Sequence, residues 1–272
     1  MPGSLSGAAP GAPPTTATVV LLHGLGLRRW AMWRMAHALA QAGYRVVNLT
    51  YPSRTVPLEA LVRDWLPRTL REKGVILGIS SGSLHFVTHS MGGIVVRGWL
   101  KEHGVPANLG RVVMLAPPNQ GAPLVDRIGR WRTFGLCTGV NGRRLGTGPD
   151  SYPRQLGPWP GGGELGIIAG NRSLLPWFRQ WSGSPGDGKV PVTHTHLEGC
   201  AAHLVLPCSH TWIQYQGSVI RQVKSFLQNG SFSPEPRPLA QDCDQSVTSQ
   251  FGGKTGQNSG QSSDFSTKTR KK

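Results

Sequence analysis

Residues 84–93 read Leu84-His-Phe-Val-Thr-His-Ser-Met-Gly-Gly93. The apolar stretch that ends at His89 predicts a buried strand, and the Val, Ile and Leu residues after Gly93 recur at helical spacing. Ser90 is therefore expected on a sharp turn from strand to helix. Small residues near such a turn let it close and let the helix approach the strand, which pushes the serine clear of both elements.

A serine in this context is typical of a nucleophile elbow, whose usual pattern is G-x-S-x-G. The chain has Thr88-His-Ser-Met-Gly92, so a bulkier threonine replaces the first glycine. We interpret Ser90 as an attacking nucleophile. The alternative is a serine that merely packs in a turn.

Strands and helices alternate on both sides of this turn. Alternation of this kind predicts an α/β fold with a mostly parallel central sheet, helices on both faces and ligand groups at the carboxyl ends of the strands. The expected strands are Thr18–His23, Arg45–Leu49, His85–His89, Arg111–Leu115 and Leu165–Ile168, and the expected helices are Trp30–Gln41, Leu58–Glu72, Gly93–Glu102 and Ile213–Gln228.

Composition divides the chain into three parts. Residues 1–17 and 229–272 are poor in large apolar residues and predict disordered tails, the second of them basic, around a domain at 18–228. Within the domain, residues 119–163 are rich in Gly, Arg and Pro, and Trp131 and Trp159 lie among them. This stretch is expected to be a lid or insertion, or else a flexible surface loop.

The formal net charge of +16 raises the question of an acidic partner. The 29 basic residues are spread along the chain, and the densest run is Lys268-Thr-Arg-Lys-Lys272. We therefore expect a solvated basic surface and no specific binding of nucleic acid, while peripheral contact with an anionic membrane stays open.

The four cysteines are irregularly spaced and do not predict a disulfide framework, which fits a reducing compartment. The N-terminal residues lack the basic and apolar regions of a secretory signal, and the apolar runs are shorter than a membrane span. The sequence as given predicts a cytoplasmic protein.

The first expected strand ends in His23-Gly-Leu-Gly-Leu27. A turn of this kind suits an oxyanion hole, in which the backbone N–H groups of Leu25 and Met91 would point at a carbonyl oxygen. The same glycines invite comparison with a dinucleotide-binding loop. That motif requires a third glycine where the chain has Arg29.

An orienting acid is expected between the serine and the base. We choose Asp187, because it lies in the turn-rich loop 183–188, downstream of the last expected strand. A simple Asp-Gly turn is the alternative explanation of this residue. The acidic residues that we considered are Glu102, Asp126, Asp150, Glu164, Asp187 and Glu198.

Four later histidines are candidates for the base. We choose His210, because it immediately precedes the final expected helix and its loop can reach over the sheet to Ser90. His194 and His196 alternate with threonines and predict one polar face of a short strand.

The density of His194, His196, Cys200, His203, Cys208 and His210 also suggests a zinc site. None of the spacings forms a paired C-x-x-C or H-x₃-H motif. We therefore expect no metal and no cofactor.

The chain resembles small bacterial lipases and esterases of the α/β-hydrolase fold and their GPI-inositol-deacylase-like relatives, over roughly residues 18–228. This resemblance implies Ser90 as nucleophile, Asp187 as acid, His210 as base, and Leu25 and Met91 as oxyanion donors, without a cofactor. It rests on Leu22-His-Gly-Leu-Gly26, Thr88-His-Ser-Met-Gly-Gly93, Leu115-Ala-Pro-Pro-Asn-Gln-Gly121, Asp187-Gly-Lys-Val190 and Ser209-His-Thr211.

The expected function is cleavage of a small-molecule or lipid carboxylic ester through an acyl-enzyme intermediate. A thioesterase, an amidase or an acyltransferase would use the same three residues. The rival from another class is a non-catalytic binding protein that kept the fold. The sequence does not predict an oligomeric state.

Overall fold

The structure, a computed structural model, describes residues 17–78, 82–174 and 183–234. The predicted N-terminal tail lies outside the described residues except for Ala17, and the predicted C-terminal tail lies outside them beyond Pro234. Both tails therefore stay predictions. The description below concerns the part of the chain up to Ser233, which clusters as one compact unit.

A six-stranded sheet forms the centre of this unit, in the order β2-β1-β3-β4-β5-β6. Every neighbouring pair is parallel, which confirms the expected parallel sheet. The strands are β1 (Thr18–Leu22), β2 (Arg45–Leu49), β3 (Leu84–His89), β4 (Leu109–Leu115), β5 (Glu164–Gly170) and β6 (Ala202–Leu206).

The sixth strand was not predicted. It lies at the edge of the sheet, where four of its five residues remain partly or fully exposed. An edge strand has only one neighbouring strand, so it can carry a polar residue such as His203, which here interrupts the short apolar run. β6 nevertheless matters for the site, because it leads into the loop that carries His210.

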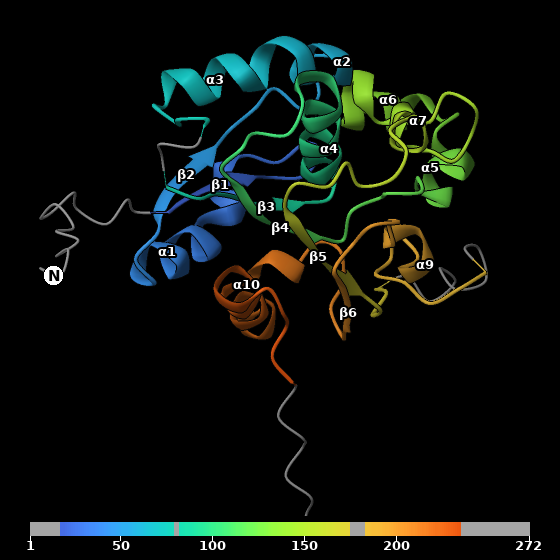
Figure 1. Ribbon diagram of the computed structural model, residues 1–272. Helices are drawn as coiled ribbons and strands as arrows, with labels where there is room; N and C mark the ends of the chain where they lie inside the picture. The colour runs from blue at the N-terminus through green and yellow to red at the C-terminus, as the bar shows by residue number, and fades with distance from the viewer. Residues whose placement is uncertain (1–16, 79–81, 175–182, 235–272) are drawn as a thin grey trace, which may run out of the picture. The chain divides into compact units, whose positions relative to one another are not determined.

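Helices cover both faces of the sheet, as Figure 1 shows. On one face α1 (Trp33–Gln41) and α10 (Gly217–Asn229) pack through residues such as Met35 and Phe226. On the other face lie α2 (Leu58–Ala60), η2 (Leu61–Trp65), α3 (Leu66–Glu72) and α4 (Met91–His103). Within the described residues, no helix combines the length and hydropathy required to cross a bilayer.

Three of the four expected helices are divided. Trp30–Gln41 corresponds to the 3₁₀ turn η1 (Arg29–Met32) and α1, while Leu58–Glu72 contains the π-helical stretch η2. The final helix is preceded by the 3₁₀ turn η5 (Ile213–Tyr215), since Gln216 is extended before α10 begins. The apolar period survives such local changes of hydrogen bonding, which is why it does not reveal them.

Residues 119–163 form a series of short helical segments. A buried arginine of α4, Arg97, fastens this insertion to the fold by donating hydrogen bonds to the backbone carbonyls of Asn119, Pro153 and Gly157. Burial lowers the pKa of Arg97 to about 10, so the guanidinium stays charged at neutral pH. The segments are α5 (Pro123–Ile128), α6 (Arg132–Thr138), η3 (Gly139–Asn141), η4 (Arg143–Leu145) and α7 (Tyr152–Gln155).

The expected short strand at His194 and His196 is wrong. Val192–Thr195 form one helical turn, α9, which begins after the extended Pro191. The N–H of His194 donates to the carbonyl of Pro191, and the Thr195 hydroxyl donates to the carbonyl of Val192. These local bonds satisfy the backbone without a neighbouring strand, so the alternation of polar residues does not mark a sheet here.

Candidate active site

Ser90 follows β3 directly and has φ 52° and ψ −122°. Residues other than glycine rarely adopt this backbone conformation. Its N–H donates to the carbonyl of Leu115 on the neighbouring strand at 2.8 Å, and its own carbonyl accepts the N–H of Gly93 at 3.0 Å. Strain of this kind costs on the order of 1–3 kcal/mol and persists only where the surrounding structure enforces it. The turn therefore has the strained geometry expected of a nucleophile elbow.

Glycines allow the close contacts around this turn. A Cβ on Gly92 would lie 2.7 Å from the carbonyl oxygen of Leu22, which is rigid backbone at the end of β1. A Cβ on Gly24 would lie 2.8 Å from Nδ1 of His89. The turn after β1 and the start of α4 can thus approach each other only because both residues lack a side chain.

Thr88 occupies the place of the usual first glycine of the motif, and its side chain is fully buried. A Cβ on Gly93 would lie 3.2 Å from the Thr88 hydroxyl oxygen, so the second glycine of the Gly-Gly pair provides the room that the threonine needs. This accommodation explains how the elbow forms without the first glycine.

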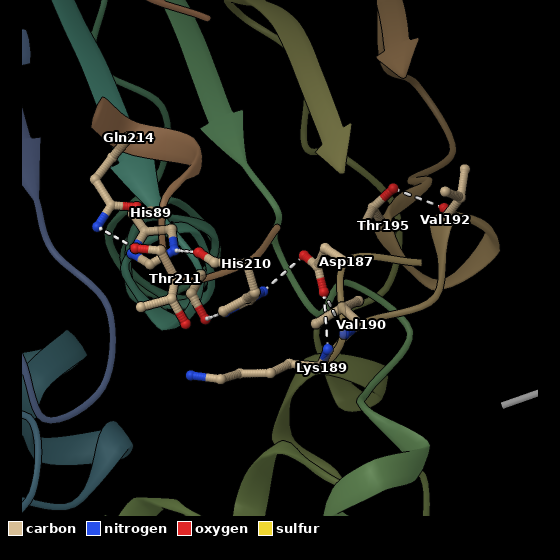
Figure 2. Close-up of polar contacts among 10 residues, drawn as sticks. His89, Asp187, Lys189, Val190, Val192, Thr195, His210, Thr211 and Gln214 are labelled. Carbon is tan, nitrogen blue, oxygen red and sulfur yellow. Dashed lines mark hydrogen bonds and ion pairs between the residues drawn. The ribbon is translucent and has the colours of Figure 1, made fainter. Parts of the chain in front are cut away.

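Three side chains that are far apart in the sequence form one hydrogen-bonded chain. The Ser90 hydroxyl lies 3.0 Å from Nε2 of His210. Nδ1 of His210 lies 2.7 Å from Oδ2 of Asp187 (Figure 2). All three side chains are buried. A carboxylate oxygen that accepts from Nδ1–H leaves Nε2 as the acceptor for the serine hydroxyl, which is the tautomer a base requires.

Asp187 also forms the Asp-Gly turn that was the alternative explanation of this residue in the sequence. Its Oδ1 accepts the backbone N–H groups of Lys189 at 2.9 Å and Val190 at 2.8 Å, and Gly188 has a positive φ of 98°. In addition, the carbonyl of Asp187 accepts the N–H of His210 at 2.9 Å. The Asp-Gly turn therefore fixes the carboxylate and fastens the loop of His210 to it.

The other acidic candidates lie elsewhere. Asp126 accepts hydrogen bonds from the backbone and hydroxyl of Thr147, and Glu164 pairs with Arg111 at 2.5 Å. Glu102, Asp150 and Glu198 are exposed. Among the described residues, Asp187 is the acid that the structure brings to His210.

The remaining histidines of the suggested zinc cluster have other partners. His194 Nδ1 lies 2.9 Å from the carbonyl of Gly121, and His203 Nε2 lies 2.7 Å from the Thr195 hydroxyl. Cys208 packs in the apolar core beneath α10, and Cys200 packs on the opposite face. Over the described ranges, no three His, Cys, Asp or Glu side chains are placed to hold a metal ion.

His89 was not singled out in the sequence, although it immediately precedes the serine. The ring is buried, and its Nε2 lies 3.0 Å from the carbonyl of His210, to which it can donate (Figure 2). Burial, followed by the positive field of His210, holds the pKa of His89 well below its usual range. A neutral His89 thus supports the loop of His210 from the strand that carries Ser90.

The turn after β1 is fixed by a second buried histidine, His23. Its Nε2 accepts the N–H of Tyr51 at 3.2 Å, which leaves Nδ1 to donate to the carbonyl of Gly24 at 2.8 Å. The Tyr51 hydroxyl donates to the carbonyl of His23 at 2.8 Å. These bonds hold the Gly24–Leu27 turn beside the elbow.

The backbone N–H groups of Leu25 and Met91 are the expected oxyanion donors. Met91 is the first residue of α4, where N–H groups have no acceptor inside the helix. Neither N–H donates to an acceptor within the ranges that the structure describes. Both groups are therefore available to a ligand.

A cavity of about 250 Å³ opens over Ser90 and His210. Its walls are mainly apolar and come largely from the insertion, through Leu124, Val125, Ile128, Phe134 and Leu145. Lys189 also lines it. Burial lowers the pKa of the Lys189 ammonium, and the nearby carboxylate of Asp187 opposes this effect.

A parallel sheet that presents a strained serine, a histidine and a carboxylate at its carboxyl ends defines the architectural class of α/β hydrolases. Residues 19–220 match the alpha/beta hydrolase family, and the chain belongs to that family. This match confirms that the motifs indicated an α/β hydrolase. No curated protein sequence matches the chain significantly.

Solved structures share the fold at low sequence identity. The propeptide form of Bacillus licheniformis lipase BlEst2 has a TM-score of 0.63 and 20% identity over 84% of this chain and 54% of its own. Phospholipase PlaB from Legionella pneumophila has a TM-score of 0.56 and 20% identity over 72% and 53%. The metagenomic carboxyl esterase MGS0156 has a TM-score of 0.54 and 18% identity over 78% and 70%. The chain thus spans about half of the first two structures.

Buried neutral histidines make the stability of the fold dependent on pH. Burial lowers the pKa of His85 to about 4, and it also lowers the pKa of His23 and His89. Unfolded histidine binds a proton below about pH 6.5, so between pH 6.5 and 4 the unfolded chain holds more protons than the folded one. Stability therefore rises with pH in this window, and urea unfolding should show a falling free energy of unfolding from pH 7 to pH 5.

His85→Gln should make the decrease in the free energy of unfolding between pH 7 and pH 5 smaller by about 1–2 kcal/mol, because it removes one titrating group. Glutamine can still accept the N–H of Arg111, which now donates to Nδ1 of His85 at 2.8 Å. His37→Gln on the exposed side of α1 is the matched control and should keep the wild-type dependence. Equal pH dependence in His85→Gln and wild type would contradict the assignment of His85 as a buried neutral group.

Proposed function

We propose that the protein is a serine hydrolase that cleaves carboxylic esters through an acyl-enzyme intermediate. Ser90 acts as nucleophile, His210 as general base and acid, and Asp187 as the carboxylate that orients His210. The observation that carries the proposal is the hydrogen-bonded chain from Ser90 through His210 to Asp187, whose first two members line a cavity.

The proposed reaction has two acyl-transfer steps. His210 Nε2 takes the hydroxyl proton as Ser90 Oγ bonds to the ester carbonyl carbon, and the protonated imidazole then gives this proton to the departing alcohol. Water, activated by the same nitrogen, attacks the acyl-enzyme, releases the acid and restores the serine. Asp187 holds the imidazole in the required tautomer and stabilises its positive charge.

The carbonyl oxygen becomes an oxyanion in both steps. The unoccupied N–H groups of Leu25 and Met91 support its stabilisation by two backbone donors, which act without reorganisation because they are already fixed. The bonds of His23 and Tyr51 fix the first donor, and the helix start fixes the second.

The apolar cavity supports an acyl substrate. Leu124, Ile128 and Phe134 offer a surface on which a hydrocarbon chain is buried, and each buried CH₂ contributes about 0.8 kcal/mol. A volume of about 250 Å³ lies below the roughly 300–1,000 Å³ of pockets that hold drug-sized ligands. This size favours a short or medium acyl chain over a long one.

The names of the structural neighbours agree with this class of substrate. They are described as a lipase, a phospholipase and a carboxyl esterase. Because the sequence identity is at or below 20%, these neighbours show only that the fold is shared. The ester substrate of this chain is therefore inferred from its own site.

Ser90→Ala is expected to abolish hydrolysis of short p-nitrophenyl esters, with a loss on the order of a millionfold in kcat, because the nucleophile is removed. Release of p-nitrophenol measures the rate, and thermal unfolding checks that the fold is intact. Ser83→Ala, the same change at an exposed serine before β3, should keep wild-type activity. Full activity in Ser90→Ala would contradict the proposal.

Asp187→Asn is expected to lower kcat by about 10⁴-fold, since the amide cannot hold His210 in the required tautomer. Asparagine keeps one oxygen for the N–H groups of Lys189 and Val190, so the turn should survive. Glu198→Gln, at an exposed acid, is the matched control and should retain activity. If Glu198→Gln lost activity and Asp187→Asn kept it, Asp187 would not be the orienting carboxylate.

A further inference from the structure

A second cavity, of about 660 Å³, adjoins the cavity over Ser90. Leu27 lines both, and the neighbouring residues Thr138 and Gly139 line one each. We call it the Arg28 cavity; its lining consists of Gly26, Leu27, Arg28, Thr50, Tyr51, Pro52, Ser53, Arg54, Thr55 and Gly139.

The lining of the Arg28 cavity is positively charged. It contains Arg28 and Arg54 together with four residues that carry a hydroxyl group, and it contains no acidic residue. Arg54 donates to the carbonyl of Leu136, which leaves further N–H groups of its guanidinium for a ligand. The guanidinium of Arg28 forms no hydrogen bond or ion pair with any residue that the structure describes.

The charge of Arg28 reaches the turn beside the proposed nucleophile. Burial is the main cause that lowers the pKa of His23, and the positive charge of Arg28 lowers it further. A cation near this turn favours a substrate whose negative charge lies close to the reacting ester.

The walls of the Arg28 cavity are held together by hydrogen bonds between three segments. The Ser53 hydroxyl accepts the N–H of Gly26 at 3.0 Å, and the amide of Asn141 donates to the Ser53 carbonyl at 2.8 Å. The N–H of Val140 donates to the carbonyl of Arg54 at 2.9 Å. A site that is already assembled loses little conformational entropy when it binds a ligand.

The close packing at Gly139 supports the same conclusion. Gly139 has a positive φ of 65°, and a Cβ there would lie 1.9 Å from the carbonyl oxygen of Arg54. The insertion can therefore close against the loop of Arg54 only through a glycine. As a result, the Arg28 cavity and the apolar cavity are lined by adjacent residues of the insertion, Gly139 and Thr138.

We propose that the Arg28 cavity binds a phosphate group in the alcohol part of the ester substrate, while the acyl part occupies the apolar cavity. An ester carbonyl at Ser90 has its acyl chain on one side and its alkoxy group on the other, and two cavities that meet at Leu27 match this division. Guanidinium forks bind phosphate oxygens in pairs, and neutral hydroxyls complete the shell. This inference rests on the proposed function and names its substrate class: acyl esters of phosphate-bearing alcohols.

The test compares two esters with the same acyl chains, 1,2-dihexanoylglycerol 3-phosphate and 1,2-dihexanoylglycerol. The measured quantity is the kcat/KM for the phosphate ester divided by the kcat/KM for the neutral ester. Arg28→Gln should lower this ratio at least tenfold, mainly by raising KM for the phosphate ester, and Arg28→Lys should retain part of it because it keeps the charge. Arg29→Gln is the matched control and should keep the wild-type ratio, since Arg29 stacks over Trp30 and does not line the cavity.

A second measurement separates a substrate phosphate from free phosphate. Inorganic phosphate is added to wild type and to Arg28→Gln, and thermal unfolding is followed. Stabilisation of wild type alone, together with a wild-type preference for the phosphate ester, supports the proposal. Stabilisation without that preference assigns the cavity to a free anion and overturns the substrate inference.

The inference and the proposed function fail in different ways. If wild type cleaves the neutral ester and Arg28→Gln has the same ratio as wild type, the inference is wrong and the proposed function stands. If wild type cleaves neither ester nor p-nitrophenyl esters, the proposed function is wrong, and the inference falls with it.

Discussion

The strained backbone of Ser90 is the constraint on which the site depends. A φ of 52° at a residue with a side chain is unfavourable by itself, and the fold enforces it through the hydrogen bond from Ser90 N–H to Leu115 and through the contact of Gly92 with the end of β1. The turn directs the hydroxyl away from both β3 and α4. The hydroxyl lies within hydrogen-bonding distance of His210, which is 120 residues further along the chain.

The loops after β1, β5 and β6 converge on this serine because all strands are parallel and end at the same edge of the sheet. Each loop is held by buried bonds of its own: His23 with Tyr51, Asp187 with Val190, and His89 with the carbonyl of His210. The polar groups that meet at the serine are therefore preorganised by hydrogen bonds between buried side chains and the backbone.

Much of this arrangement could be predicted from the sequence because it rests on local patterns. Apolar runs located five of the six strands, and the Ser-Met-Gly-Gly segment located the turn at Ser90. The choice of Asp187 followed from its place in a loop after a strand, and the structure puts its carboxylate against His210. β6 escaped detection because His203 interrupts its short apolar run. The threonine–histidine alternation at 193–196 misled because a single helical turn satisfies that backbone.

Long-range packing determines what the sequence could not reveal. Nothing in the local sequence shows that Gly93 makes room for Thr88, or that His89 supports a loop more than a hundred residues away. The two cavities likewise arise where the insertion packs against the loops after β1 and β2. Composition alone could not separate a lid from a flexible loop at residues 119–163, because the walls of a cavity depend on which loops meet.

The reactivity of Ser90 is tested by labelling with a fluorophosphonate probe, which reacts with a serine when a base activates it and an oxyanion hole receives the phosphoryl oxygen. The native protein is treated with the probe, digested, and its serine-containing peptides are examined by mass spectrometry. We expect a single label on Ser90, and we expect it to disappear when the protein is heat-denatured before treatment. An unlabelled Ser90 in the folded protein would contradict the central claim that its hydroxyl is a poised nucleophile.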